Sequence, residues 1–148
     1  MPVGAARRMR RLLTRPADLA LAAEAAAWLV LAWLALELLP FRRVAALLRP
    51  EPRPAGRPAD LARLRWAIKA VSRRLPCRIV CFHRGIAAQR MLCGRGVAAD
   101  LHYGVMRLAD GSLGAHVWVT AEGEAVIGGE EAEACTLLTT FPARRSKI

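Results

Sequence analysis

Two segments decide the fold: residues 81–105, CFHRGIAAQRMLCGRGVAADLHYGV, and residues 114–119, GAHVWV. The residues after the first cysteine predict a helix over 81–93, which glycines at 94 and 96 end. Residues 97–105 then alternate between apolar and polar side chains, as a strand does. A cysteine on a helix and a histidine on a later strand can form a thiolate and its base from distant positions.

The segments downstream predict the rest of a small antiparallel sheet. Turn signals are expected at 110–111 and 122–123, and strands over 113–120 and 124–127. Two glycines end the last strand, and the acidic residues after them begin a final helix or loop. We therefore predict an α+β fold, in which the helix carrying Cys81 packs on a small antiparallel sheet carrying His116 and an N-terminal helical region precedes them.

An amphipathic helix is predicted over residues 60–74, just before this core. Asp60 is its candidate cap. Apolar residues recur at three- and four-residue spacing and should face the core. They are Leu61, Leu64, Ile68 and Val71.

A long apolar helix is predicted over residues 19–39, with Asp18 as a carboxylate at its start and Pro40 at its end. Glu24 and Glu37 interrupt its apolar run, which favours a helix buried in the protein or lying at an interface. A transmembrane span, or association with a membrane through 19–39, is the alternative. A short second helix is expected over 41–48.

Residues 49–58, RPEPRPAGRP, form a predicted linker because four prolines and a glycine exclude regular structure. The expected organisation is therefore an N-terminal helical region, the linker, a core that carries Cys81 and His116, and a tail. These parts cover 1–48, 49–58, 59–141 and 142–148.

The net charge of +11 points to anionic partners. The competing interpretation is a compositional bias that uses arginine in place of lysine, since only Lys69 and Lys147 are lysines. No basic run is interleaved with stacking aromatic residues, so we expect no nucleic-acid partner. The basic start of the chain, 1–16, faces either lipid or water. No secretory signal is evident, and we expect a cytoplasmic protein, with membrane association as an alternative.

Four cysteines, Cys77, Cys81, Cys93 and Cys135, are then expected to be free thiols available for packing, metal binding or catalysis. Cys77 and Cys81 with one of the others would offer thiolates to zinc, but a second close pair is missing. We expect no metal and no cofactor.

The candidate catalytic pair is Cys81 and His116. The helix start lowers the pKa of a thiol, and the strand carrying His116 can be brought beside it. His83 and His102 are competing bases; His83 lies two residues from Cys81 and so does not face it, and His102 could point to solvent. In the competing interpretation, the cysteine is a small core residue and the histidine a structural one.

These residues also resemble a known family. Residues 81–105 resemble the segment C-L-x-x-A-L-A-x-x-x-L-L-x-R-x-G-V-x-A-x-L-x-x-G-V of the transglutaminase-like cysteine peptidases of lasso-peptide biosynthesis. Residues 114–119 resemble their A-H-A-W-V block, and EGEAVIGG at 122–129 resembles the strand that follows. The likeness covers most of the chain, is specific between 75 and 129, and is to the stand-alone peptidase form.

The resemblance implies a transglutaminase-like or papain-like core over 59–141. It also implies that Cys81 is the nucleophile and His116 the general base of a leader peptidase. Its implied partners are a lasso precursor peptide, a separate leader-recognition protein and the lasso cyclase. The family acid, usually Asp about a dozen residues after the histidine, is replaced by Gly128. Glu130 and Glu131 just beyond are candidates for the third member, and a Cys–His dyad is the alternative. The missing acid also favours a second hypothesis, a non-catalytic binding or scaffold subunit of the same maturation complex.

Overall fold

The computed structural model describes residues 15–53 and 60–143. Its elements, in chain order, are α2 (Pro16–Leu38), α3 (Phe41–Leu47), α4 (Leu61–Ser72), α5 (Cys81–Cys93), β1 (Ala99–Arg107), β2 (Leu113–Ala121), β3 (Glu124–Ile127), the 3₁₀ helix η1 (Gly129–Ala134) and β4 (Thr136–Phe141). Residues 1–14, the second half of the predicted linker (54–58) and residues 144–148 of the predicted tail lie outside the described residues.

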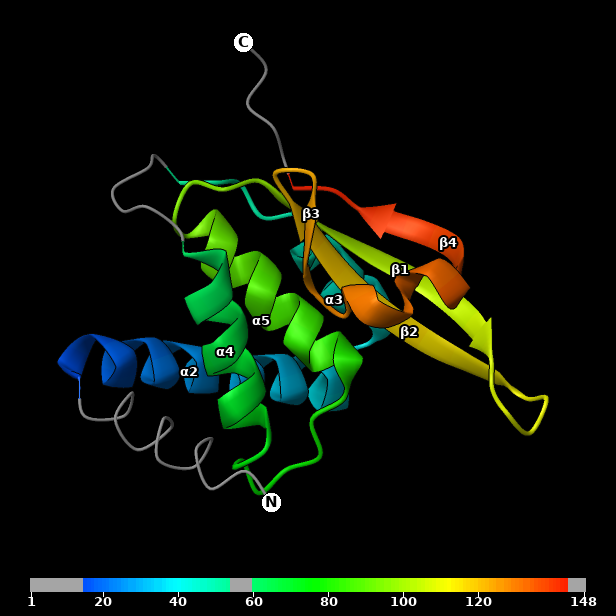
Figure 1. Cartoon of the computed structure of the whole chain (residues 1–148), viewed down its shortest axis with the longest axis horizontal. Coiled ribbons are helices and arrows are strands. Elements are labelled where there is room, and N and C mark those ends of the chain that lie inside the picture. Colours follow the sequence, from blue (N-terminus) through cyan, green and yellow to red (C-terminus); the bar gives the residue numbers. More distant parts are fainter. Residues whose placement is uncertain (1–14, 54–59, 144–148) are drawn as a thin grey trace, which may run out of the picture.

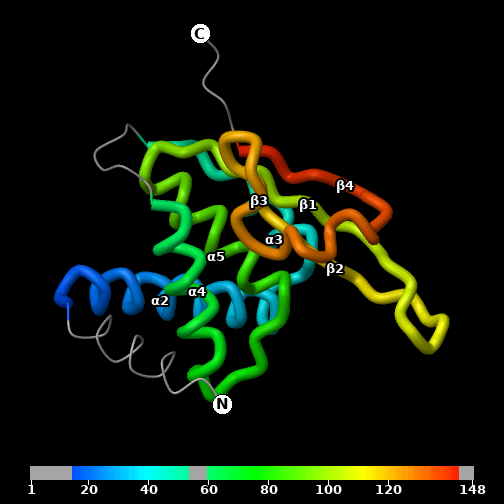
Figure 2. Tube along the Cα trace, in the orientation of Figure 1, coloured from blue at the N-terminus to red at the C-terminus, as the bar shows by residue number. Residues whose placement is uncertain are grey.

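The fold is a helical layer packed on a four-stranded antiparallel sheet, as predicted (Figure 1). The strand order is β3-β2-β1-β4, and the hairpin between β1 and β2 projects beyond the body of the molecule (Figure 2). The predicted bounds of α5 and β3 are confirmed. The strand β4 was not predicted; it adds to the free edge of β1, where Tyr103 pairs with Thr139.

Helix α5 lies against the sheet because its sequence leaves room for close approach. A Cβ atom added to Gly85 would lie 2.6 Å from Val117 Cγ1 and 3.3 Å from Leu101 Cδ1. The neighbouring Ala87 and Ala88 are fully buried. The predicted small-residue face of this helix is therefore its contact with β1 and β2.

Helix α4 begins at Asp60, whose side chain accepts a hydrogen bond from the Arg63 backbone N–H at 3.1 Å, as the sequence predicted. Its predicted core residues Leu64 and Ile68 are buried. Leu61 and Val71 are half-buried and pack against the same core.

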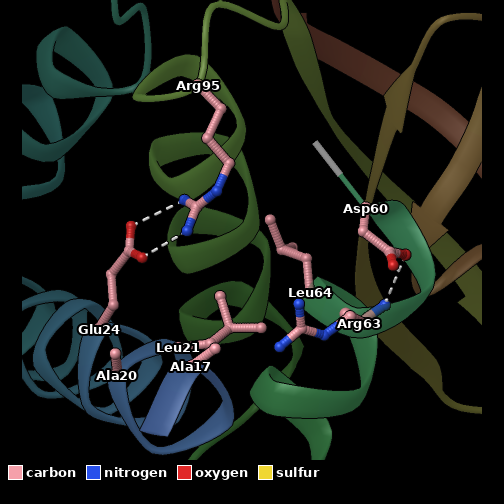
Figure 3. A pocket seen from close by; sticks show the side chains of 8 residues that line it. All are labelled: Ala17, Ala20, Leu21, Glu24, Asp60, Arg63, Leu64 and Arg95. Atoms are coloured by element: carbon pink, nitrogen blue, oxygen red, sulfur yellow. Dashed lines mark hydrogen bonds and ion pairs between the residues drawn. The ribbon is translucent and has the colours of Figure 1, made fainter. Parts of the chain in front are cut away.

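The long helix α2 joins this same core along one side only. Ala25 and Leu29 are fully buried within it. Asp18, also buried, forms an ion pair with Arg63 of α4. Glu24 forms two hydrogen bonds with Arg95, at 2.9 and 2.6 Å, across a cavity of about 230 Å³ between the helices (Figure 3). The helix thus packs on the core along one side, and helices from both sides of the predicted linker contribute to that core.

The buried side chain of Gln89 connects three segments at the end of α5. Its Nε2 lies 2.9 Å from the carbonyl of Leu48, 3.1 Å from that of Ala99 and 3.0 Å from that of Phe141. The three carbonyls belong to the residue after α3, the first residue of β1 and the last residue of β4. Buried carbonyl groups need a donor, so this one amide fastens helices and both inner and edge strands together.

We expect Gln89→Leu to lower the free energy of unfolding by about 2–4 kcal/mol, because it leaves buried carbonyls without a donor. Urea denaturation followed by circular dichroism measures the change. Arg84→Leu, at a half-exposed position of the same helix, serves as the control and should shift stability by less than about 0.5 kcal/mol. Equal stability of both variants would contradict the role given to Gln89.

Candidate active site

Cys81 is the first residue of α5, as predicted, and is half-buried. The preceding Val80 is extended and offers no side-chain cap. By helix geometry the backbone N–H groups of the first turn have no acceptor within the helix, and they give this end a partial positive charge. The Cys81 side chain therefore lies at the positive end of the helix.

His116 lies on β2 and is buried. Alternation along the strand turns Val117 towards α5 and His116 towards the opposite face of the sheet. Pairing between β2 and β3 stops at Val119 and Ile127, so β2 has an open edge at His116. The site is therefore at this edge of the sheet, where groups from both faces can meet.

Cys81 and His116 line one cavity of about 300 Å³ at that edge. Its other lining residues are Lys69, Arg84, Val117, Ile127, Gly128, Glu130 and Glu131. The helices supply a cationic wall and the start of η1 an acidic one. In the described part of the chain the two side chains share the cavity without a hydrogen bond between them. The structure thus brings the predicted pair together around a space that a substrate group can enter.

Both nitrogens of the His116 ring have a partner. Nε2 lies 2.7 Å from the backbone oxygen of Gly128, and Nδ1 lies 3.2 Å from Oε2 of Glu131. The ring also stacks on Trp118 with 6.0 Å between centroids. A carbonyl only accepts, so Nε2 carries a hydrogen and Nδ1 is the nitrogen that exchanges a proton.

Of the two glutamates that the sequence offered as a third member, the structure brings Glu131 to His116. The side chain of Glu131 is 60% exposed. Glu130 instead lies 3.3 Å from Lys69. Its pKa is lowered, first by a hydrogen bond from its own backbone N–H and then by Lys69.

Gly128 holds its carbonyl against His116 in a conformation that suits glycine. Its φ is +72°, and a Cβ there would lie 2.6 Å from the Val117 oxygen and 3.3 Å from His116 Nε2. An aspartate at the position of the family acid therefore does not fit this backbone. The backbone carbonyl of Gly128 contacts His116 Nε2 in place of a side-chain carboxylate.

The two competing histidines have other partners. His83 Nδ1 accepts a hydrogen bond from the Val80 N–H at 2.9 Å, and burial lowers its pKa. His102 does not point to solvent as the sequence suggested. It bridges Thr120 and Thr140, at 2.8 and 3.0 Å, across three strands, and burial lowers its pKa too. Their environments indicate structural roles.

All four cysteines are free. Within residues 15–53 and 60–143, no group of three or more His, Cys, Asp or Glu side chains is arranged to hold a metal ion. Burial is the largest cause of a raised pKa at both Cys93 and Cys135. At Cys135 the charges of Glu131 and Cys81 also contribute, so this thiol lies near the candidate nucleophile.

These pKa shifts predict the order of thiol alkylation. A raised pKa leaves less thiolate at a given pH, so Cys93 and Cys135 should react only at a pH above that of an ordinary thiol. We expect iodoacetamide at pH 7 to modify Cys81 about tenfold faster than either. Peptide mapping by mass spectrometry between pH 7 and 9 measures this. Equal rates at pH 7 would contradict the assignment of Cys81 as the reactive thiol.

The sequence did not predict the Gly128 carbonyl or the cationic wall made by Lys69 and Arg84. A glycine pair after a strand, as at 128–129, is a signal for a left-handed backbone position, but from the sequence it predicts only the end of a strand. Lys69 belongs to a separate helix, and no spacing in the sequence connects it to Cys81.

Residues 25–140 match the family model of the transglutaminase-like superfamily, a range that includes α2 from Ala25 onwards as well as the sheet. No curated protein and no solved structure matches the chain significantly.

Proposed function

Because the chain belongs to the transglutaminase-like superfamily, we propose that it is a cysteine peptidase that removes the leader from a lasso precursor peptide. The observation that carries the proposal is the cavity shared by Cys81 at a helix start and His116 at a sheet edge. The leader-peptidase assignment rests further on the resemblance of 81–105 and 114–119 to the lasso peptidases.

The proposed reaction follows from this arrangement. Cys81 gives its proton to His116 Nδ1 and attacks the scissile carbonyl, and backbone N–H groups at the start of α5 stabilise the oxyanion. The peptide C–N bond then breaks, and the imidazolium returns the proton to the leaving amine. Water hydrolyses the thioester, which frees the leader and restores the thiol.

The Gly128 carbonyl serves as the orienting group in this proposal. It fixes the hydrogen on Nε2, so Nδ1, which faces Glu131, is the nitrogen that acts as the base. Glu131 has an electrostatic role, since it lies beside the nitrogen that gains the proton. Because Glu131 is largely exposed, it can move aside when the thiol and substrate approach.

The proposed partners are the precursor peptide and a separate leader-recognition protein, with the cyclase acting on the product. A non-catalytic scaffold subunit is the second candidate function. It is favoured by the lack of a carboxylate at position 128 and by the absence, in the part of the chain described, of a Cys81–His116 hydrogen bond.

A cleavage assay distinguishes the two functions. The purified full chain is incubated with a candidate lasso precursor, with and without the recognition protein, and the products are weighed by mass spectrometry. We expect one cut at the leader–core junction, stimulated by the recognition protein and lost after alkylation of Cys81. Precursor binding without any cut would support the scaffold and overturn the peptidase, as would cutting that survives alkylation.

A further inference from the structure

The side of α2 that faces away from the core is apolar along the whole helix. Its exposed residues follow spacings of three and four and form a single stripe. They are Ala20, Ala23, Ala27, Leu31, Leu34 and Leu38. Leu31 is 54% exposed and Leu38 76%. An exposed apolar stripe along a helix is typical of a surface that a partner covers.

The apolar surface continues from α2 onto α3. A groove of about 240 Å³ separates the two helices, and the exposed Leu31 and Leu47 both line it. Arg90 also lines the groove, with its guanidinium 5.9 Å from the centre of the Trp28 ring. The stripe and the groove together, with Leu47, are called the α2–α3 surface below.

Positive charge lies at both ends of the α2–α3 surface. Arg43 is exposed and lies four residues before Leu47, so the two share a face of α3. Arg15 is exposed at the start of α2, and the sequence before it holds four more arginines, at 7, 8, 10 and 11. The exposed acid of α2, Glu37, lies near His83 of α5. Burial lowers the pKa of His83, and the charge of Glu37 opposes that shift. An apolar strip with arginine at both ends is complementary to an anionic lipid surface.

The inner side of α2 excludes a spanning position, although the helix is long and apolar enough to cross a membrane. Leu29 is fully buried in the core. Asp18 and Glu24 bind Arg63 and Arg95 of the neighbouring structure. A span would expose these groups to lipid, whereas a helix lying in the membrane plane keeps them.

We propose that the α2–α3 surface docks this protein on the face of an anionic phospholipid bilayer, with α2 parallel to the membrane. The stripe from Ala20 to Leu38 is about 27 Å long, from 1.5 Å per residue. Its six side chains are apolar, the exposed acid Glu37 lies beside Leu38, and arginines lie at its two ends. This inference is independent of the peptidase proposal.

Co-sedimentation of the full chain with vesicles tests it. We expect binding to phosphatidylcholine vesicles containing 30% phosphatidylglycerol to be at least about tenfold tighter than to phosphatidylcholine alone. Leu31→Ser with Leu38→Ser should weaken binding about tenfold or more. The matched control replaces Leu113 and Leu138, equally exposed but on the sheet, and should bind as the wild type does.

Charge reversals give a second, independent arm. Arg43→Glu should reduce the preference for anionic vesicles, while Arg107→Glu on the distant β1–β2 hairpin should not. Circular dichroism checks that each variant is folded. Equal sedimentation of the wild type with both kinds of vesicle would overturn the proposal. So would a stable dimer, seen by light scattering, that the Leu31/Leu38 variant dissociates, because a second copy would then cover the surface.

Discussion

Replacing Cys81 by alanine is expected to lower the rate of leader cleavage by about 10⁴-fold or more and to leave the fold intact. In the proposed reaction, the Cys81 sulfur at the start of α5 is the cavity atom that forms a covalent bond with the substrate. Without it the reaction has neither the thiolate nor the thioester, and only binding and polarisation of the substrate remain. Cys81 is half-buried at a helix end, so its loss costs little packing.

The same prediction has a matched control within the chain. Cys77 lies four residues before Cys81, and its thiol is also half-buried. The Cys77→Ala variant should keep a cleavage rate within about threefold of the wild type. Both variants are compared with the wild type in the cleavage assay, and their melting temperatures are measured alongside. A Cys81→Ala protein that cuts the precursor at the wild-type rate would remove the basis for a cysteine peptidase.

Those parts of the fold that depend on local signals could be predicted from the sequence. Helix α5 and strand β3 have the predicted bounds because glycines and turn residues mark their ends. Strand β4 was missed because it lacks the alternation of a half-buried strand: Leu137 and Leu138 are both exposed. Its pairing with β1 specifies it, and such pairing is not visible locally.

The candidate site was predictable to a different extent. Side-chain chemistry pointed to Cys81 and His116, and the structure places both at one cavity. The choice between Glu130 and Glu131 could not be made from sequence, because it depends on the tight turn of η1. The group that holds Nε2 is a backbone carbonyl, which any residue possesses and which no sequence pattern names.

Gly128→Ala is expected to lower the rate of leader cleavage by about 10²-fold or more, because it moves the carbonyl that holds His116. The added Cβ would lie 2.6 Å from the Val117 oxygen, so the backbone at 128 must shift away from β2. A ring freed from this carbonyl loses its fixed tautomer, and Nδ1 is then no longer reliably the basic nitrogen. The nitrogen chemical shifts of His116 in NMR spectra report that tautomer directly.

The control for this change is another glycine in the same left-handed backbone conformation. Gly123 has φ +80°, and a Cβ there would meet nothing within 4 Å. Gly123→Ala and Gly128→Ala should both lose about 1–2 kcal/mol of stability from the left-handed conformation. Only Gly128→Ala should also lose activity and alter the His116 shifts. If the two variants cleave equally well, the carbonyl of Gly128 does not position the base, and Glu131 becomes the orienting group that remains in the cavity.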